Sequence, residues 1–265
     1  MARNDGWRGV IKYGFMIVLL AVAGCANGQR EGMPDSMDNA KSHGEWPQIS
    51  KSELGLDYLL YLPRGYTLQP KKSFPLLLYL HGFEQRGELL SKVREVGVPK
   101  QLEDGRDFGM IVVAPQVKAR KAWNKRELGS LLDEIEATYR VDIGRIYVTG
   151  EGIGGYGTYV LAGDRPERYA AIAPISSAAY VEQSVKLRTV PVWVFHGKLD
   201  GIVPVESAVD MVYALDALGG LSRLTIYEQG DHNIAEKVYA KDELYAWLLK
   251  HKRILETGKI VVSGE

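Results

Sequence analysis

Short apolar runs recur along the chain between residues 56 and 227 and alternate with longer segments of mixed polarity. The clearest run is Phe74–Leu80, a weakly alternating run covers 56–62, and similar runs lie at 110–114, 146–149, 171–175, 192–195 and 224–227. Continuous apolar runs of this length are typical of strands buried on both faces of a parallel sheet. Helical patterns separate them at 91–103, 127–139, 155–162, 205–218 and 241–251. This alternation predicts an α/β fold with a mostly parallel central sheet and helices on both faces.

Composition and charge argue for one domain and against nucleic-acid binding or a metal site. The chain has 265 residues and 46% hydrophobic content, which suits one core of ordinary size and therefore one main domain. Lys plus Arg and Asp plus Glu each number 33, so there is no basic excess of the kind that binds nucleic acid. The five histidines are dispersed without an H-E-x-x-H motif, and the only cysteine excludes an internal disulfide and a cysteine-based zinc cluster. We therefore expect no metal and no nucleic-acid partner.

The N-terminus has the pattern of an export signal. Residues 1–12 carry three basic residues against one acidic residue, and the apolar run at 15–23 is too short to cross a bilayer. The following Val22-Ala-Gly-Cys25 resembles the bacterial lipobox, which implies that Cys25 is lipidated and becomes the first residue of the mature chain. The alternative is an ordinary signal peptide with an incidental cysteine. Residue 26 is alanine and not the aspartate that often retains lipoproteins at the inner membrane, so the outer membrane is the favoured location.

These features predict an exported protein that is attached to the bacterial cell envelope, and to its membrane only through a lipid anchor. Residues 1–24 would be the signal peptide and 25–45, rich in Gly, Asp, Asn and Ser, a flexible tether. The folded domain would span 46–258. Residues 259–265 would be a polar tail or a short extra strand.

A glycine-rich turn follows the apolar run at 146–149. Gly150 and Gly154 lie four apart before a helical pattern, which is the arrangement of a G-x-S-x-G nucleophile elbow. In such an elbow the middle residue projects a nucleophile from a strained turn. Here the middle residue is Gly152, which has no side chain. The same stretch formally matches G-x-G-x-x-G, but it lies mid-chain without the acidic residue about 20 positions on that would hold a ribose, so we expect no cofactor.

Three further motifs follow strands, at the edge of a parallel sheet where ligands bind. They begin with His81-Gly82, with His196-Gly197 and, at the last strand, with Gly230-Asp-His232. Together with the elbow, their order and spacing over residues 56–249 resemble the small esterases of the α/β-hydrolase fold, the carboxylesterase, phospholipase and dienelactone-hydrolase-like group. The resemblance implies this fold and, because insertions between motifs are few, no large lid.

The resemblance also implies roles for individual residues. Asp200 would be the triad acid and His232 the base, with Gly152 at the nucleophile position. The backbone N–H groups of Phe83 and Ile153 would bind the oxyanion. The structural alternatives are that Asp200 caps the helix from residue 205 and that His232 lies in a surface loop.

Other residues follow less directly from the resemblance. Gly82, Trp123, Tyr156 and Ser176 are expected in the pocket, although core packing of the two aromatic residues is an equal alternative. We interpret His196 as a structural turn residue and Glu84 with Arg86 as an ion pair that stiffens the loop. Ser176 or Ser177 could replace the missing nucleophile, but neither lies on an elbow.

Gly152 leaves three explanations. The protein is a pseudoenzyme whose pocket binds a small ester, a carbohydrate-linked ligand or a protein partner. Alternatively, it is an esterase for short acyl, aryl or sugar esters in which His232 activates a water in the space of the serine. Finally, a parent enzyme with serine at this position has been altered to glycine. Without the nucleophile, such sites keep only about 10³ to 10⁴-fold acceleration over water, so efficient ester hydrolysis is expected to be lost.

Overall fold

The computed structural model describes residues 50–256 and 259–263 of the chain, all within the second of two units, Ser36–Glu265. The expected signal peptide, the tether, Cys25 and the domain start at residue 46 lie outside the described residues. None of the helices in the described part is long and apolar enough to cross a membrane.

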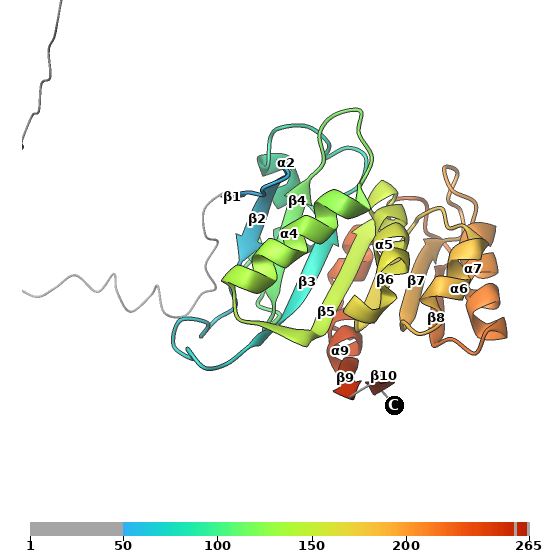
Figure 1. Ribbon diagram of the computed structural model, residues 1–265. Coiled ribbons are helices and arrows are strands. Elements are labelled where there is room, and N and C mark those ends of the chain that lie inside the picture. The colour runs from blue at the N-terminus through green and yellow to red at the C-terminus, as the bar shows by residue number, and fades with distance from the viewer. Residues whose placement is uncertain (1–49, 257–258, 264–265) are drawn as a thin grey trace, which may run out of the picture. The chain divides into compact units, whose positions relative to one another are not determined.

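One sheet of eight strands forms the centre of the described chain (Figure 1). Its spatial order is β1 (Ser50–Lys51), β2 (Asp57–Tyr61), β4 (Ile111–Gln116), β3 (Phe74–Leu80), β5 (Val141–Glu151), β6 (Ala171–Ile175), β7 (Val192–Gly197) and β8 (Ser222–Tyr227). The pairs β1–β2 and β2–β4 are antiparallel, and all pairs from β4 to β8 are parallel. The predicted mostly parallel sheet is confirmed.

Helices pack on both faces of this sheet. On the face turned to the viewer in Figure 1 lie α4 (Lys125–Thr138), α5 (Ile153–Asp164), α6 (Ser184–Leu187) and α7 (Glu206–Ala217). The other face packs against α2 (Ser91–Arg94), α3 (Gly97–Glu103), α8 (Ala235–Tyr239) and α9 (Asp242–Lys250). Two 3₁₀ turns, η1 (Pro166–Arg168) and η2 (Val181–Gln183), complete the connections.

Every residue of β3 is apolar because the strand is covered by helices on both faces. Leu76 and Leu78 belong to the core on the side of α4 and α5, whereas Leu77 and Tyr79 belong to the core on the side of α3 and α8. Successive side chains of a strand point to opposite faces, so a strand between two helical layers needs apolar residues at every position. All seven residues of β3 are buried.

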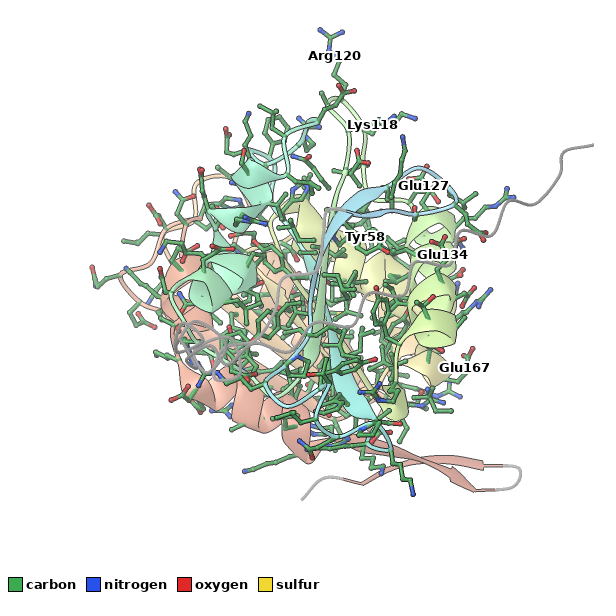
Figure 2. The ribbon with its side chains drawn as sticks, turned by 90° about the vertical axis from the view of Figure 1, so that its left-hand side faces the viewer. Tyr58, Lys118, Arg120, Glu127, Glu134 and Glu167 are labelled. Atoms are coloured by element: carbon green, nitrogen blue, oxygen red, sulfur yellow. The ribbon has the colours of Figure 1, made fainter. Side chains whose placement is uncertain are left out.

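Helix α4 is amphipathic and has a defined start. The side chain of Asn124 accepts hydrogen bonds from the backbone N–H groups of Arg126 and Glu127, which satisfies amides that a helix N-terminus leaves unpaired. Figure 2 shows Glu127 and Glu134 on α4 and the exposed Arg120 at the tip of the loop that joins β4 to α4. Asn124 thus starts α4 where this loop returns to the sheet.

The helices differ from the predictions at three places, and the C-terminal residues match one of two alternatives. The single helix expected at 91–103 is broken into α2 and α3, because Val96 is extended and Gly97 has φ +56°. A Cβ at Gly97 would lie 2.3 Å from the hydroxyl of Tyr79, so only glycine permits this approach. The short helices α6 and α8 were not expected. At the C-terminus, β9 (Lys252–Glu256) pairs with β10 (Lys259–Ser263), so of the two alternatives for 259–265 the short extra strand is the one observed.

Candidate active site

The turn between β5 and α5 has the geometry of a nucleophile elbow. Gly152 has φ 54° and ψ −115°, a conformation that favours glycine and strains other residues. Its N–H donates to the carbonyl of Ile175 (3.0 Å), and its own carbonyl accepts from Tyr156 N–H (3.1 Å). A Cβ at Gly154 would lie 2.0 Å from the carbonyl oxygen of Leu80, so the elbow packs directly on the backbone of β3. Neighbouring glycines therefore keep the turn tight.

Asp200 and His232 meet beside this turn. Asp200 Oδ2 accepts from His232 Nδ1 at 2.8 Å, while Oδ1 accepts from the N–H groups of Ile202 and Val203 at 2.8 and 2.9 Å. Burial favours a raised pKa for Asp200, but the hydrogen bonds from Val203, His232 and Ile202 outweigh it, and the pKa is lowered. Asp200 does not cap α7, which has no side-chain cap. The site therefore contains an ionised carboxylate that orients the imidazole.

The free nitrogen of His232 faces the nucleophile position. A Cβ built on Gly152 would lie 3.3 Å from His232 Nε2. His196, interpreted from sequence as structural, lies behind the pair, with Nε2 2.9 Å from the carbonyl of Val203 and 3.2 Å from Asp200 Oδ2. The structure thus brings Gly152, Asp200 and His232 together in the order in which a triad works, with no hydroxyl at its first member.

Two backbone amides beside the cavity make no hydrogen bond within the described part of the chain. The N–H groups of Phe83 and Ile153 have no acceptor among the described residues, and both residues line the cavity next to Gly152. Val117 N–H donates to His81 Nε2 (3.1 Å), so the ring proton lies on Nδ1 and is donated to the Gly82 carbonyl (2.7 Å). Since a trans peptide points its C=O and N–H in opposite directions, this bond turns the Phe83 N–H away from His81.

The cavity at the elbow measures about 650 Å³. It is lined by Gly82, Phe83, Glu84, Gln85, Val96, Glu151, Gly152, Ile153, Tyr156, Ala178, Tyr180, Ile202, Val203, His232, Asn233, Ala235 and Glu236. No serine, threonine or cysteine occurs among these lining residues. The described part of the chain also contains no group of three or more residues that could hold a metal ion.

Three expectations for the loops need correction. Trp123 does not line the cavity: it is buried, stands edge-on to His81 and donates from Nε1 to the His81 carbonyl (3.3 Å). Ser176 is also buried outside the cavity, with φ 44° and a hydroxyl without a partner in the described chain. Arg86 does not pair with Glu84 among the described residues; its guanidinium stacks 3.6 Å from the centre of the Phe83 ring and donates to the Lys121 carbonyl.

Several cavity residues were not expected from the sequence. Glu151 directly precedes Gly152, and Glu236 lies on α8, a helix that was itself not predicted. Tyr180 and Ile202 are 59% and 72% exposed at the cavity. The sequence contained a signal for Glu151, because this carboxyl group directly precedes Gly152 at the end of β5.

The fold and the site together define the class of protein. A mostly parallel sheet with β2 antiparallel at one side, helices on both faces, a strained glycine turn after β5 and an Asp–His pair after β7 and β8 are the arrangement of the α/β-hydrolase fold. Residues 55–198, more than half of the chain, match the sequence family described as "Putative esterase", and the chain belongs to this family. Residues 169–253 also match the prolyl oligopeptidase family.

Individual relatives agree with this assignment. A bifunctional acetylxylan esterase/xylanase from Neocallimastix patriciarum is 28% identical over 156 residues, which cover 56% of this chain and 22% of the relative. A thermostable esterase of known structure is 26% identical with a TM-score of 0.68, covering 80% of this chain and 64% of that protein. A ferulic acid esterase shares the fold at 16% identity and a TM-score of 0.62, covering 78% and 98%. The chain thus spans only part of the first two proteins.

His81 makes a testable contribution to stability. Burial lowers its pKa from 6.5 to about 4, despite the opposing bond to the Gly82 carbonyl. The folded state therefore protonates His81 less readily than the unfolded state does. The contribution of neutral His81 to the free energy of unfolding is fully present above pH 6.5 and is lost as the pH falls to about 4. A shift of this size corresponds to about 3 kcal/mol.

We expect His81→Asn to lower the free energy of unfolding at pH 7.5 by about 1–3 kcal/mol, because the new side chain cannot satisfy both Val117 N–H and the Gly82 carbonyl. The difference from the parent should shrink at pH 4.5. Urea unfolding at the two pH values measures both effects. His251, whose pKa burial also lowers, is present in both proteins and cancels. A difference that is independent of pH would contradict the neutral, buried His81.

Proposed function

We propose that this protein binds a small ester or carbohydrate-linked ligand in the elbow cavity and hydrolyses esters inefficiently. One observation carries the proposal: Asp200 and His232 are paired and face Gly152, yet no lining side chain offers a hydroxyl or thiol of serine, threonine or cysteine. Binding requires only the cavity and its donors, which are present. Covalent catalysis requires a nucleophile. The acetylxylan esterase activity named for one relative makes acetylated carbohydrate the first ligand to test.

A second candidate rests on the space at Gly152. The Cβ position there lies 3.3 Å from His232 Nε2, so a water in this space is within reach of a general base. His232 Nε2 would take a proton from the water, and the hydroxide would attack the ester carbonyl. The negative oxygen would be bound by the N–H groups of Phe83 and Ile153. Collapse would expel the alcohol as it takes the proton back from His232.

Hydrolysis of p-nitrophenyl acetate by the parent and by His232→Ala separates these candidates. If the slow hydrolysis does not depend on His232 as a base, the parent and His232→Ala should react at the same low rate. If His232 activates water, the parent should exceed His232→Ala by about 100-fold, the lower end of the usual range of general-base effects. Turnover by the parent at about 10 s⁻¹, the median for enzymes, would contradict the proposal that the missing nucleophile limits the reaction.

A further inference from the structure

The charged side chains that line the cavity have one sign. Three carboxylates line it, those of Glu84, Glu151 and Glu236, and no lysine or arginine does. The nearby cation Arg86 is occupied elsewhere, because it stacks on Phe83 and donates to the carbonyls of Phe83 and Lys121. Among the lining residues, only His232 can carry a positive charge, and its Nδ1 is bound to Asp200.

Glu151 holds its carboxyl group at the wall of the cavity. One oxygen, Oε1, accepts from the buried hydroxyl of Tyr79 at 2.8 Å, and the second oxygen has no partner among the described residues. The side chain lies close to the backbone at Gly82, since a Cβ built on Gly82 would lie 3.3 Å from the Cγ of Glu151. A carboxylate oxygen without a partner in a partly enclosed site is unfavourable unless a donor reaches it. A bound ligand can supply that donor.

The electrostatic environment of Glu151 also favours a ligand with a positive charge. Burial raises its pKa and the charge of Glu236 adds to this, while the bond from Tyr79 and the proximity of His232 oppose it. Burial disfavours the ionised form of Glu151 because it removes water from the carboxylate, and Glu236 disfavours it by repulsion between like charges. A ligand with a positive charge beside Glu151 would remove this penalty, whereas an anion would increase it.

Aromatic side chains supply the rest of the lining that such a ligand needs. Tyr156 and Tyr180 both line the cavity and contact each other edge to face, with ring centres 5.7 Å apart and planes at 80°. Ile202 and Phe83 add exposed apolar surface at the same cavity. Aromatic faces attract cations, and apolar surface binds an alkyl or aryl group.

We propose that the cavity selects ligands in which a positively charged nitrogen is attached to an apolar body, with the nitrogen beside Glu151. This inference rests on the proposed binding of a small ester in the cavity and narrows that ester to one with a cationic nitrogen, in preference to a neutral carbohydrate-linked ligand. A neutral hydroxyl group would satisfy the free oxygen of Glu151 but would leave the charge of the carboxylates uncompensated. An anionic ligand would face all three of them.

Binding of three probes of similar size tests the proposal. Benzylammonium carries the charge and N–H donors, ethylbenzene is its neutral counterpart of similar shape, and benzoate is an anion. By calorimetry or competition at pH 8, we expect the ammonium probe to bind about tenfold more tightly than ethylbenzene, a preference within the range of cation–π and charge interactions at partly enclosed sites. Glu151→Gln, whose amide oxygen can still accept from Tyr79, should reduce this preference to less than about threefold.

The matched control is Glu88→Gln, which removes a carboxylate from an exposed residue that does not line the cavity and should keep the preference. Equal binding of ethylbenzene, tighter binding of benzoate, no binding of any probe, or a preference that survives Glu151→Gln would each overturn the proposal. The elbow geometry is tested separately with a neutral ester, so the ligand class can fail while the proposed function stands.

Discussion

Gly152→Ser is expected to give the protein measurable esterase activity. The new Cβ lies 3.3 Å from His232 Nε2, so the hydroxyl that extends from it is within reach of the base that Asp200 already orients. Phe83 and Ile153, whose amides are the proposed oxyanion donors, line the same cavity. Because a complete triad exceeds its remnants by two orders of magnitude or more, kcat/KM for p-nitrophenyl acetate should rise at least about 100-fold over the parent.

Two further variants show whether the gain comes from a triad. Gly152→Ala adds the Cβ without the hydroxyl and should give no gain, and His232→Ala in the serine variant should abolish it. Both substitutions at residue 152 should lower the free energy of unfolding by about 1–3 kcal/mol, because φ 54° is strained for a residue with a side chain. A folded serine variant without any gain would show that these groups do not form an esterase site.

Gly154→Ala is expected to destabilise the protein strongly. Its Cβ would lie 2.0 Å from the carbonyl oxygen of Leu80 and 2.7 Å from that of His81. Both are backbone atoms at the end of a central strand, so neither can rotate away, and α5 would have to move from the sheet. We expect a loss of at least about 3 kcal/mol in the free energy of unfolding, at the upper end of overpacking effects. Urea unfolding or the soluble yield measures it.

Gly163→Ala is the matched control in the same helix. A Cβ there meets nothing within 4 Å, and Gly163 does not have a positive φ. Alanine lowers the entropy of the unfolded chain and favours the helix, so this variant should be neutral or more stable by up to about 1 kcal/mol. Equal stability of the two variants would contradict the close packing of α5 on β3.

The periodicity predicted the parallel strands well because both faces of the sheet are covered. Phe74–Leu80 and Ala171–Ile175 have the bounds that the apolar runs predict, since burial on two sides leaves no polar position inside the strand. The break between α2 and α3 could not be predicted in this way. It depends on the hydroxyl of Tyr79 approaching Gly97 from a strand far away in the sequence.

The candidate site was predictable where it depends on the ends of strands. Asp200 and His232 follow β7 and β8, and the parallel sheet brings these ends together. The directions of side chains were not predictable. Trp123 turns toward His81 and away from the cavity, and Arg86 stacks on the ring of Phe83 instead of pairing with the carboxylate of Glu84. Such arrangements depend on contacts in space that spacing along the chain does not encode.

The packing of Gly154 against the end of β3 has a consequence for which side chains residue 152 can carry. The tight turn is maintained by glycines on either side of residue 152 and by the hydrogen bond from Gly152 N–H to Ile175, none of which needs a side chain at residue 152. The backbone of the turn is therefore compatible with a glycine or a small side chain at residue 152, and the positive φ sets the free-energy difference between the two.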